Sequence, residues 1–101
     1  MNSKQQAKHY KELTDKIRKV QVSKQGDYAN EDVLSNFKVA GANCQLSAEM
    51  QCLSLIATKV ARLGVLLQTE ETPNNESIRD SVLDMANYSI LLDMILTDKT
   101  K

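Results

Sequence analysis

NESIRDSVLDMANYSILLDMIL, residues 75–96, is the stretch that decides the fold. Its apolar residues recur at helical spacing. Pro73 breaks the chain just before it, and Asn74 or Asn75 can cap the helix that follows. We therefore predict a long helix over residues 75–97.

A row of acids runs along this predicted helix. Glu76, Asp80 and Asp84 recur every four residues, and Tyr88 continues the row. Residues four apart lie on one face of a helix, so the row could hold a metal ion, hold a basic partner or face water.

Two helices are predicted in the first half of the chain. The first covers residues 4–22 and has a narrow apolar stripe formed by Ala7, Tyr10, Leu13, Ile17 and Val20. Turn-forming residues follow in KQGDYANED, residues 24–32. A short helix is then expected from about Glu31 to Gly41, with Gly41 and Asn43 ending it. It would present Val33, Leu34, Phe37 and Ala40.

The remaining long helix is predicted to follow Ser47 and to run to about Leu67. Ser47 is a suitable N-cap, and Glu49 places a negative charge in the first turn, where the helix dipole favours it. The expected fold is all-α: three long helices and one short helix in a bundle, the last two long helices forming an antiparallel hairpin. We expect a single domain over residues 1–101, with a basic amphipathic helix over residues 1–22 and a core over residues 23–97.

The composition is typical of a folded helical protein. Of the 101 residues 42% are hydrophobic and 26% are charged. The formal net charge is zero, so no basic field predicts binding to duplex nucleic acid. Cys44 and Cys52 lack a second pair, which indicates neither a disulfide framework nor a zinc site. No uncharged run reaches the roughly 20 residues that cross a membrane, so we expect a cytoplasmic protein without membrane contact.

The last two long helices are apolar on more than one face. From Leu53 to Leu67 the charged residues are Lys59 and Arg62, and from Ser81 to Leu96 they are Asp84 and Asp93. Such helices are central to a bundle or buried in an oligomer. Because a short chain has little else to cover both, we expect a homodimer or a larger assembly.

Opposite charges are expected to meet across these two helices. Lys59 and Arg62 share one helix face, opposite the acidic row of the next helix. The charges could form an internal salt-bridge cluster that orients the helices, because buried charges must be paired. They could instead line a pocket for a phosphate or a cation. Fixed positive charge beside the acids favours an anion over Mg²⁺.

Residues 24–38, KQGDYANEDVLSNFK, are a second candidate site. They supply an aromatic that can stack on a base, two cations and two amides: Tyr28, Lys24, Lys38, Asn30 and Asn36. The alternative is a capped turn in which Tyr28 and Phe37 close the end of the bundle. With His9 as the single histidine, no Ser/His/Asp or Cys/His catalytic arrangement is predicted.

The succession KQGDYANED…LSNF, KVARLGVLL and NESIRDSVLDMANYSILL resembles the phage and bacterial "nucleotide modification associated" domain family over residues 23–96. It is also similar, more distantly, to the MazG-like all-α NTP pyrophosphohydrolases. The resemblance implies a helical, oligomeric fold and a nucleotide ligand. In the pyrophosphohydrolases two acidic sets on successive helices hold Mg²⁺. The resemblance carries only the second set over, onto Glu76, Asp80 and Asp84, and Lys59 and Arg62 replace the first.

Three functions are therefore expected. The first is a small phage-type protein that binds a nucleotide or cyclic nucleotide without cleaving it, for example as a sponge for an immune messenger in the host cytoplasm. Its ligand-binding residues would be Lys59, Arg62, Tyr28, Lys24, Asn36 and Tyr88, with Glu76, Asp80 and Asp84 as supporting acids and no cofactor. The second is a divergent pyrophosphohydrolase, in which those three acids hold Mg²⁺. The third is a structural or protein-interaction module.

Overall fold

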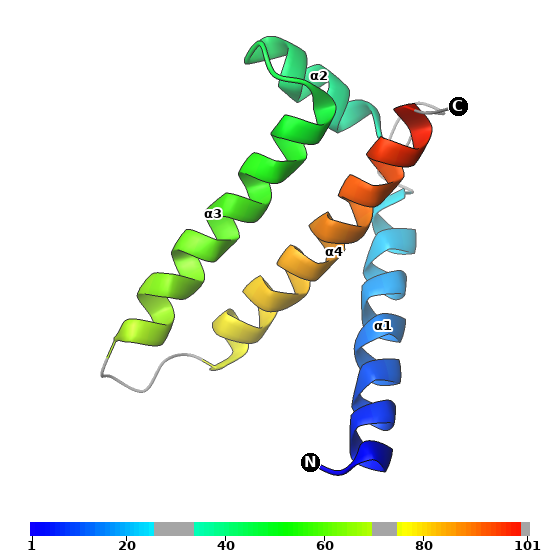
Figure 1. Ribbon diagram of the computed structural model, residues 1–101, viewed down its shortest axis with the longest axis vertical. Coiled ribbons are helices and arrows are strands. Elements are labelled where there is room, and N and C mark those ends of the chain that lie inside the picture. The colour runs from blue at the N-terminus through cyan, green and yellow to red at the C-terminus, as the bar shows by residue number, and fades with distance from the viewer. Residues whose placement is uncertain (26–33, 70–74, 100–101) are drawn as a thin grey trace. The chain divides into compact units, whose positions relative to one another are not determined.

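The protein is helical throughout the part of the chain that can be described. The computed structural model describes residues 1–25, 34–69 and 75–99, apart from the side chains of residues 22–25 and 75–77. Over these residues the chain forms α1 (Ser3–Gln25), α2 (Ser35–Asn43), α3 (Ala48–Gln68) and α4 (Asn75–Lys99), and no strand (Figure 1). The predicted all-α fold with three long helices and one short helix is confirmed. Contacts divide the chain into two compact units, Met1–Val33 and Leu34–Lys101.

Helix α1 is stabilised by interactions within itself. At its start the Asn2 Oδ1 atom accepts from the Gln5 backbone N–H, and the Asn2 N–H donates to Gln5 Oε1, both at 2.9 Å. Lys11 and Asp15, one turn apart, form an ion pair of 2.7 Å. Their hydrogen bond raises the pKa of Lys11 and lowers the pKa of Asp15. The predicted first helix is therefore confirmed, with most of its described side chains exposed.

Helix α2 ends at Asn43, one of the two residues that were expected to end it, and continues past the other, Gly41. Its predicted beginning, residues 31–33, lies outside the described residues. Gly41 lies inside the helix and is buried. The turn that follows uses Gln45, whose φ of 58° is in the left-handed region. The Leu46 N–H donates to the Gly41 carbonyl at 2.7 Å, and the Gln45 N–H donates to the Ala42 carbonyl at 3.1 Å. This is the Schellman pattern, with glutamine in the position that glycine usually takes.

Glycine is required at position 41 because the backbone of Leu46 and Ser47 approaches it closely. A Cβ atom at this position would lie 2.7 Å from the Leu46 carbonyl oxygen and 2.9 Å from the Ser47 carbonyl oxygen. Both contacts are shorter than a side chain tolerates. The missing side chain therefore allows the chain to turn tightly from α2 into α3.

The start of α3 is capped as predicted. Ser47 Oγ accepts a hydrogen bond of 3.2 Å from the Met50 backbone N–H. Glu49 lies in the first turn and forms an ion pair of 3.2 Å with Lys99 at the end of α4. Hydrogen bonds from Ser47 and from Lys99 lower the pKa of Glu49. The first turn of α3 is thus joined by an ion pair to the last turn of α4.

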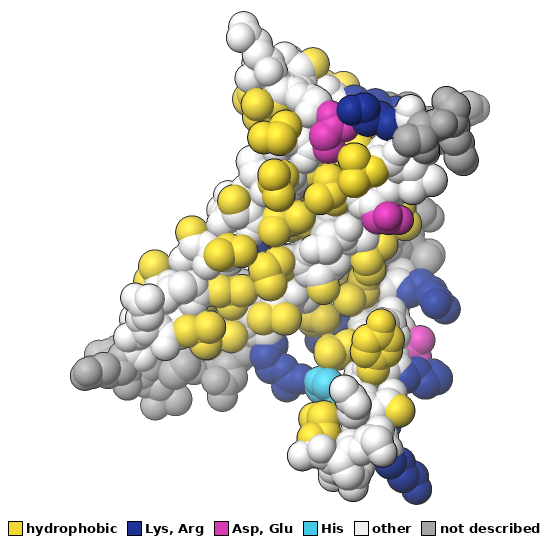
Figure 2. Space-filling view, in the orientation of Figure 1, with side chains coloured by type: hydrophobic (Ala, Val, Ile, Leu, Met, Phe, Trp, Pro, Cys, Tyr) yellow, Lys and Arg dark blue, Asp and Glu magenta, His cyan; other side chains and the backbone are white. Residues whose placement is uncertain are grey.

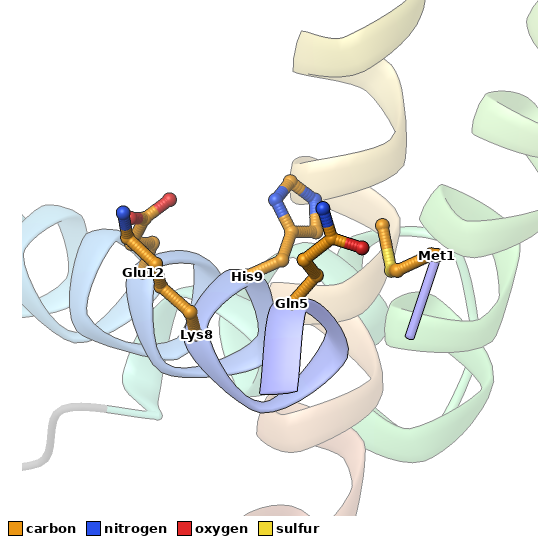
Figure 3. Close-up of a pocket in the computed structure, with 5 residues that line it drawn as sticks. All are labelled: Met1, Gln5, Lys8, His9 and Glu12. Atoms are coloured by element: carbon orange, nitrogen blue, oxygen red, sulfur yellow. The ribbon is translucent and has the colours of Figure 1, made fainter. Parts of the chain in front are cut away.

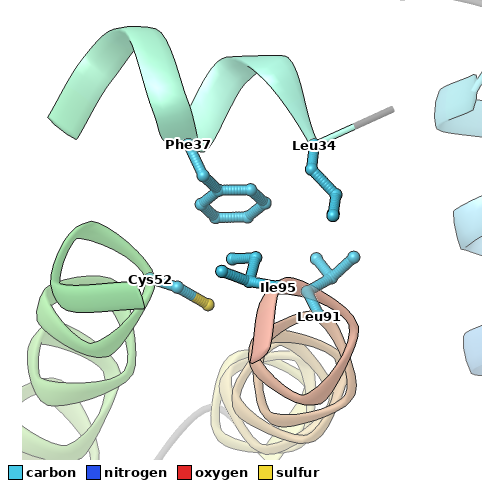
Figure 4. Close-up of a cluster of buried hydrophobic side chains, with 5 residues drawn as sticks. All are labelled: Leu34, Phe37, Cys52, Leu91 and Ile95. Carbon is cyan, nitrogen blue, oxygen red and sulfur yellow. The ribbon is translucent and has the colours of Figure 1, made fainter. Parts of the chain in front are cut away.

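A small hydrophobic cluster holds α2, α3 and α4 together (Figure 4). Its buried members are Leu34, Phe37, Cys52, Leu91 and Ile95. Of the four residues that the short helix was expected to present, Phe37 and Leu34, which directly precedes α2, are buried in this cluster. Ala40 is half-buried, and Val33 lies outside the described residues. Cys52 is fully buried, its Sγ donates to the Tyr88 carbonyl at 3.3 Å, and burial raises the pKa of its thiol. This side chain fixes the face that α3 turns toward α4.

The two helical glycines form a matched pair for a stability test. We expect Gly41→Ala to lower the free energy of unfolding by about 1–3 kcal/mol, because the new methyl group overlaps backbone oxygens. Gly64→Ala should raise it by up to about 1 kcal/mol, because a Cβ there meets nothing within 4 Å and alanine favours helix. Urea unfolding at low protein concentration measures both. Equal effects of the two substitutions would contradict the close approach at Gly41.

Candidate functional site

Lys59 and Asp84 of the predicted charged cluster form an ion pair between α3 and α4. The Lys59 Nζ atom lies 3.0 Å from Asp84 Oδ2. The Lys59 side chain is 22% exposed and that of Asp84 is 45% exposed, so water reaches both partners. Because the pair joins two helices, it helps to set their register, as the salt-bridge interpretation expects.

The other charges of the cluster are not drawn into one buried site. Asp80 and Arg62 are exposed on α4 and α3. Glu76 is in the first turn of α4, and its side chain lies outside the described residues. Among the described side chains no group of three His, Cys, Asp or Glu is placed to hold a metal ion. The structure thus brings Lys59 and Asp84 together, and leaves Asp80 and Arg62 at the surface.

The remaining predicted ligand residues lie in different surroundings. Tyr88 is half-buried and packs against the hydrophobic cluster, and Asn36 is exposed on α2. Lys38, also on α2, forms an ion pair of 3.3 Å with Asp98 near the end of α4. Tyr28 and the side chain of Lys24 lie outside the described residues.

A surface pocket lies on α1, and none of the predicted site residues lines it. Its lining side chains all come from the start of the chain: Met1, Gln5, Lys8, His9 and Glu12 (Figure 3). Gln5, the adjacent Lys8 and His9, and Glu12 follow one another at helical spacing and share one face of α1, and Met1 lies just before the helix. Residues of one helix cannot enclose a ligand, so this hollow does not constitute a binding site.

The most prominent surface feature is an exposed apolar row on α3. Six residues recur at alternating spacings of three and four: Met50, Leu53, Ala57, Val60, Gly64 and Leu67. We call them the α3 stripe. Its four large side chains are 45–66% exposed. This spacing is the heptad pattern by which one helix packs against another.

The α3 stripe is distinct from the face that packs on α4. At 100° per residue it lies roughly 100° around the helix from the buried Cys52 and Leu63. Helix α4 is also apolar on its outer side, where Val82, Ile90, Met94 and Leu96 are 43–47% exposed. Figure 2 shows the hydrophobic side chains as a broad band over α3 and α4. The sequence indicated that these helices are apolar on more than one face. The α3 stripe could have been found as a second row of heptad spacing along α3, beside the row that contains Cys52.

Helix α3 is long and apolar enough to cross a membrane by length and composition, and only 11% of its most apolar stretch is buried. Core helices of soluble proteins pass the same test, although they are mostly buried. Lys59 and Arg62 lie near the middle of this helix, and each such charge costs about 2.5–3.5 kcal/mol at the centre of a bilayer. The composition of α3 therefore fits contact with protein better than contact with lipid.

A double-mutant cycle measures the contribution of the interhelical ion pair. With Lys59→Met and Asp84→Asn, we expect a coupling energy of about 0.5–1 kcal/mol, because Asp84 remains nearly half exposed. The exposed pair Lys11–Asp15 within α1 is the control, and its coupling should be smaller. Urea unfolding of the four proteins gives the value. Zero coupling at Lys59–Asp84 would show that the pair does not hold the helices together.

Comparison of the chain with models of known protein families, with curated proteins and with solved structures finds no match. The family resemblance of the sequence therefore stays a prediction.

Proposed function

We propose that this chain is a helical interaction module that self-associates. In this proposal α3 and α4 act as one antiparallel hairpin, and the α3 stripe is the surface through which copies meet. The observation that carries the proposal is the exposure of this stripe: four large apolar side chains on one helix face, 45–66% exposed. Exposed apolar patches on a folded protein commonly mark interaction sites.

Self-association would be favourable because it removes exposed apolar surface from water. Full burial of a Val, Leu or Met side chain is worth about 1.5–3 kcal/mol, so covering a half-exposed one gains roughly 1 kcal/mol. The stripe offers four such side chains per copy. By contrast, the cluster that holds α2, α3 and α4 together contains five buried hydrophobic residues among those described. Assembly would thus add substantially to a small core.

The mass of the protein in solution tests self-association. We expect light scattering to give at least twice the chain mass of 11.3 kDa at micromolar concentration, decreasing on dilution. Val60→Asp should shift the protein to the monomer, because it places a charge in the stripe. Val65→Asp is the matched control, since Val65 is 66% exposed on the same helix but off the stripe. A monomer at every concentration would overturn the proposal.

Nucleotide binding is a second candidate function. It is supported by the placement of two cations, Lys59 and Arg62, one turn apart on α3, where Lys59 remains partly exposed beside its carboxylate partner. In this proposal the two cations contact phosphate, and Asp84 holds Lys59 in position. The pyrophosphohydrolase alternative would instead use Asp80 and Asp84 for Mg²⁺.

A thermal-shift series with linear and cyclic nucleotides separates these candidates. Binding without cleavage predicts a rise in Tm that persists in EDTA and is lost in Arg62→Ala. Arg18→Ala is the control, an exposed arginine on α1. Release of pyrophosphate with Mg²⁺, abolished by Asp80→Ala, would support the enzyme instead. No shift and no turnover with any nucleotide would leave interaction as the function of this surface.

A further inference from the structure

The α3 stripe has an order of large and small residues that is informative about its partner. Along the helix it reads Met50, Leu53, Ala57, Val60, Gly64 and Leu67. A two-fold axis perpendicular to the helix, passing midway between Ala57 and Val60, would place each residue of the stripe opposite another in a second copy. The pairs would be Met50 with Leu67, Leu53 with Gly64, and Ala57 with Val60.

We propose that the partner of the α3 stripe is the same stripe of a second copy, docked antiparallel about this axis to form a closed dimer. The inference rests on the proposed self-association and adds its partner, orientation and register. In this register a large residue meets a small one in two of the three layers, so the helices can approach closely. A parallel pair would instead place Ala57 on Ala57 and Gly64 on Gly64, which leaves voids in two layers.

Gly64 supports this pairing because no contact within its own chain requires a glycine at that position. A Cβ at Gly64 would meet nothing within 4 Å, in contrast to Gly41, where backbone oxygens exclude one. Leu53, which is 45% exposed, is the side chain that the antiparallel register places over Gly64. The glycine then serves the contact between copies, as a place where a leucine of the partner fits.

Charge does not oppose the contact. No residue of the stripe is charged, and the positions that flank it are Ser54, Ile56, Ala61, Leu63, Gln68 and Glu49. The charge of Glu49 is paired with Lys99, 3.2 Å away. The central cations of α3 lie elsewhere: Lys59 turns toward Asp84 of α4, 3.0 Å away. Antiparallel helices also set their dipoles in opposition, which is favourable. A second copy therefore meets an apolar row whose charged neighbour, Glu49, already has a partner.

The apolar area of this face can be compared with that of known interfaces. The stripe spans 17 residue steps, about 26 Å, on a helix about 10 Å across, so half of its circumference presents roughly 400 Å². Two stripes alone would therefore bury about 800 Å² in total, less than the roughly 1,200 Å² of a stable specific interface. The hydrophobic band that continues over α4 in Figure 2 would have to supply the rest. Helix α1 has a shorter apolar row, from Ala7 to Val20, about 20 Å long, and would leave part of the stripe uncovered.

Cysteine cross-linking distinguishes the register. The background is Cys44→Ser, because Cys44 is exposed, while the buried Cys52 is kept. Met50→Cys and Leu67→Cys are made in separate full-length chains, one carrying a tag that changes its mass, and the chains are mixed and oxidised. We expect a mixed disulfide dimer in the mixture and none from either chain alone. Identical positions would lie about 26 Å apart, beyond the reach of a disulfide.

An exchange of a large and a small residue tests the Leu53–Gly64 pair of the same register without cysteines. Gly64→Leu should raise the dimer dissociation constant at least tenfold, because two leucines would then collide. Adding Leu53→Ala should recover most of the loss. Within one chain these positions are about 16 Å apart along α3, so such a rescue reports contact between copies.

The outcomes separate the two proposals. Disulfide dimers from each single variant would overturn the antiparallel register, as would an oligomer that shows neither cross-link nor rescue, while self-association itself would stand. A monomeric mass for the unaltered chain would overturn both. A monomer that co-floats with phosphatidylcholine vesicles would assign the stripe to a lipid surface instead.

Discussion

The complete burial of Cys52 is the constraint on which the described part of the second unit depends. Its side chain lies among Leu34, Phe37, Leu91 and Ile95, and its thiol donates to the Tyr88 carbonyl. A small residue at this point lets α3 approach α4 while α2 covers the end of both helices (Figure 4). This contact sets the rotation of α3 about its own axis. It therefore also determines which residues of α3 stay exposed.

The charged residues act mainly as connections between helices. Lys59 joins α3 to Asp84 of α4, Glu49 joins the start of α3 to Lys99, and Lys38 joins α2 to Asp98. All of these pairs are partly exposed, so each contributes modestly to stability and more to register. The same pairing limits what the cations offer a ligand, since a phosphate would have to compete with a carboxylate already 3.0 Å from Lys59.

The large exposed apolar surface follows from the small size of the described core. A chain with 42% hydrophobic residues and few residues in its described core leaves much apolar surface in contact with water. Assembly through the α3 stripe would bury part of that surface without moving the helices. Gly41 and Gly64 illustrate the difference between internal and external packing: the first is confined by its own backbone, and the second faces open space.

The sequence alone determined the helical content, because hydrophobic spacing, the Ser47 cap and the scarcity of Gly and Pro are local properties. It also identified Leu34 and Phe37 as core residues. It could not determine that α2 continues through Gly41, since that depends on the carbonyls of Leu46 and Ser47 returning toward it. Nor could it decide which acid meets Lys59, or which of two heptad registers on α3 faces α4. Both registers are mostly apolar, although the one that faces α4 includes Lys59, and only the packing around Cys52 selects one for the core and leaves the other exposed.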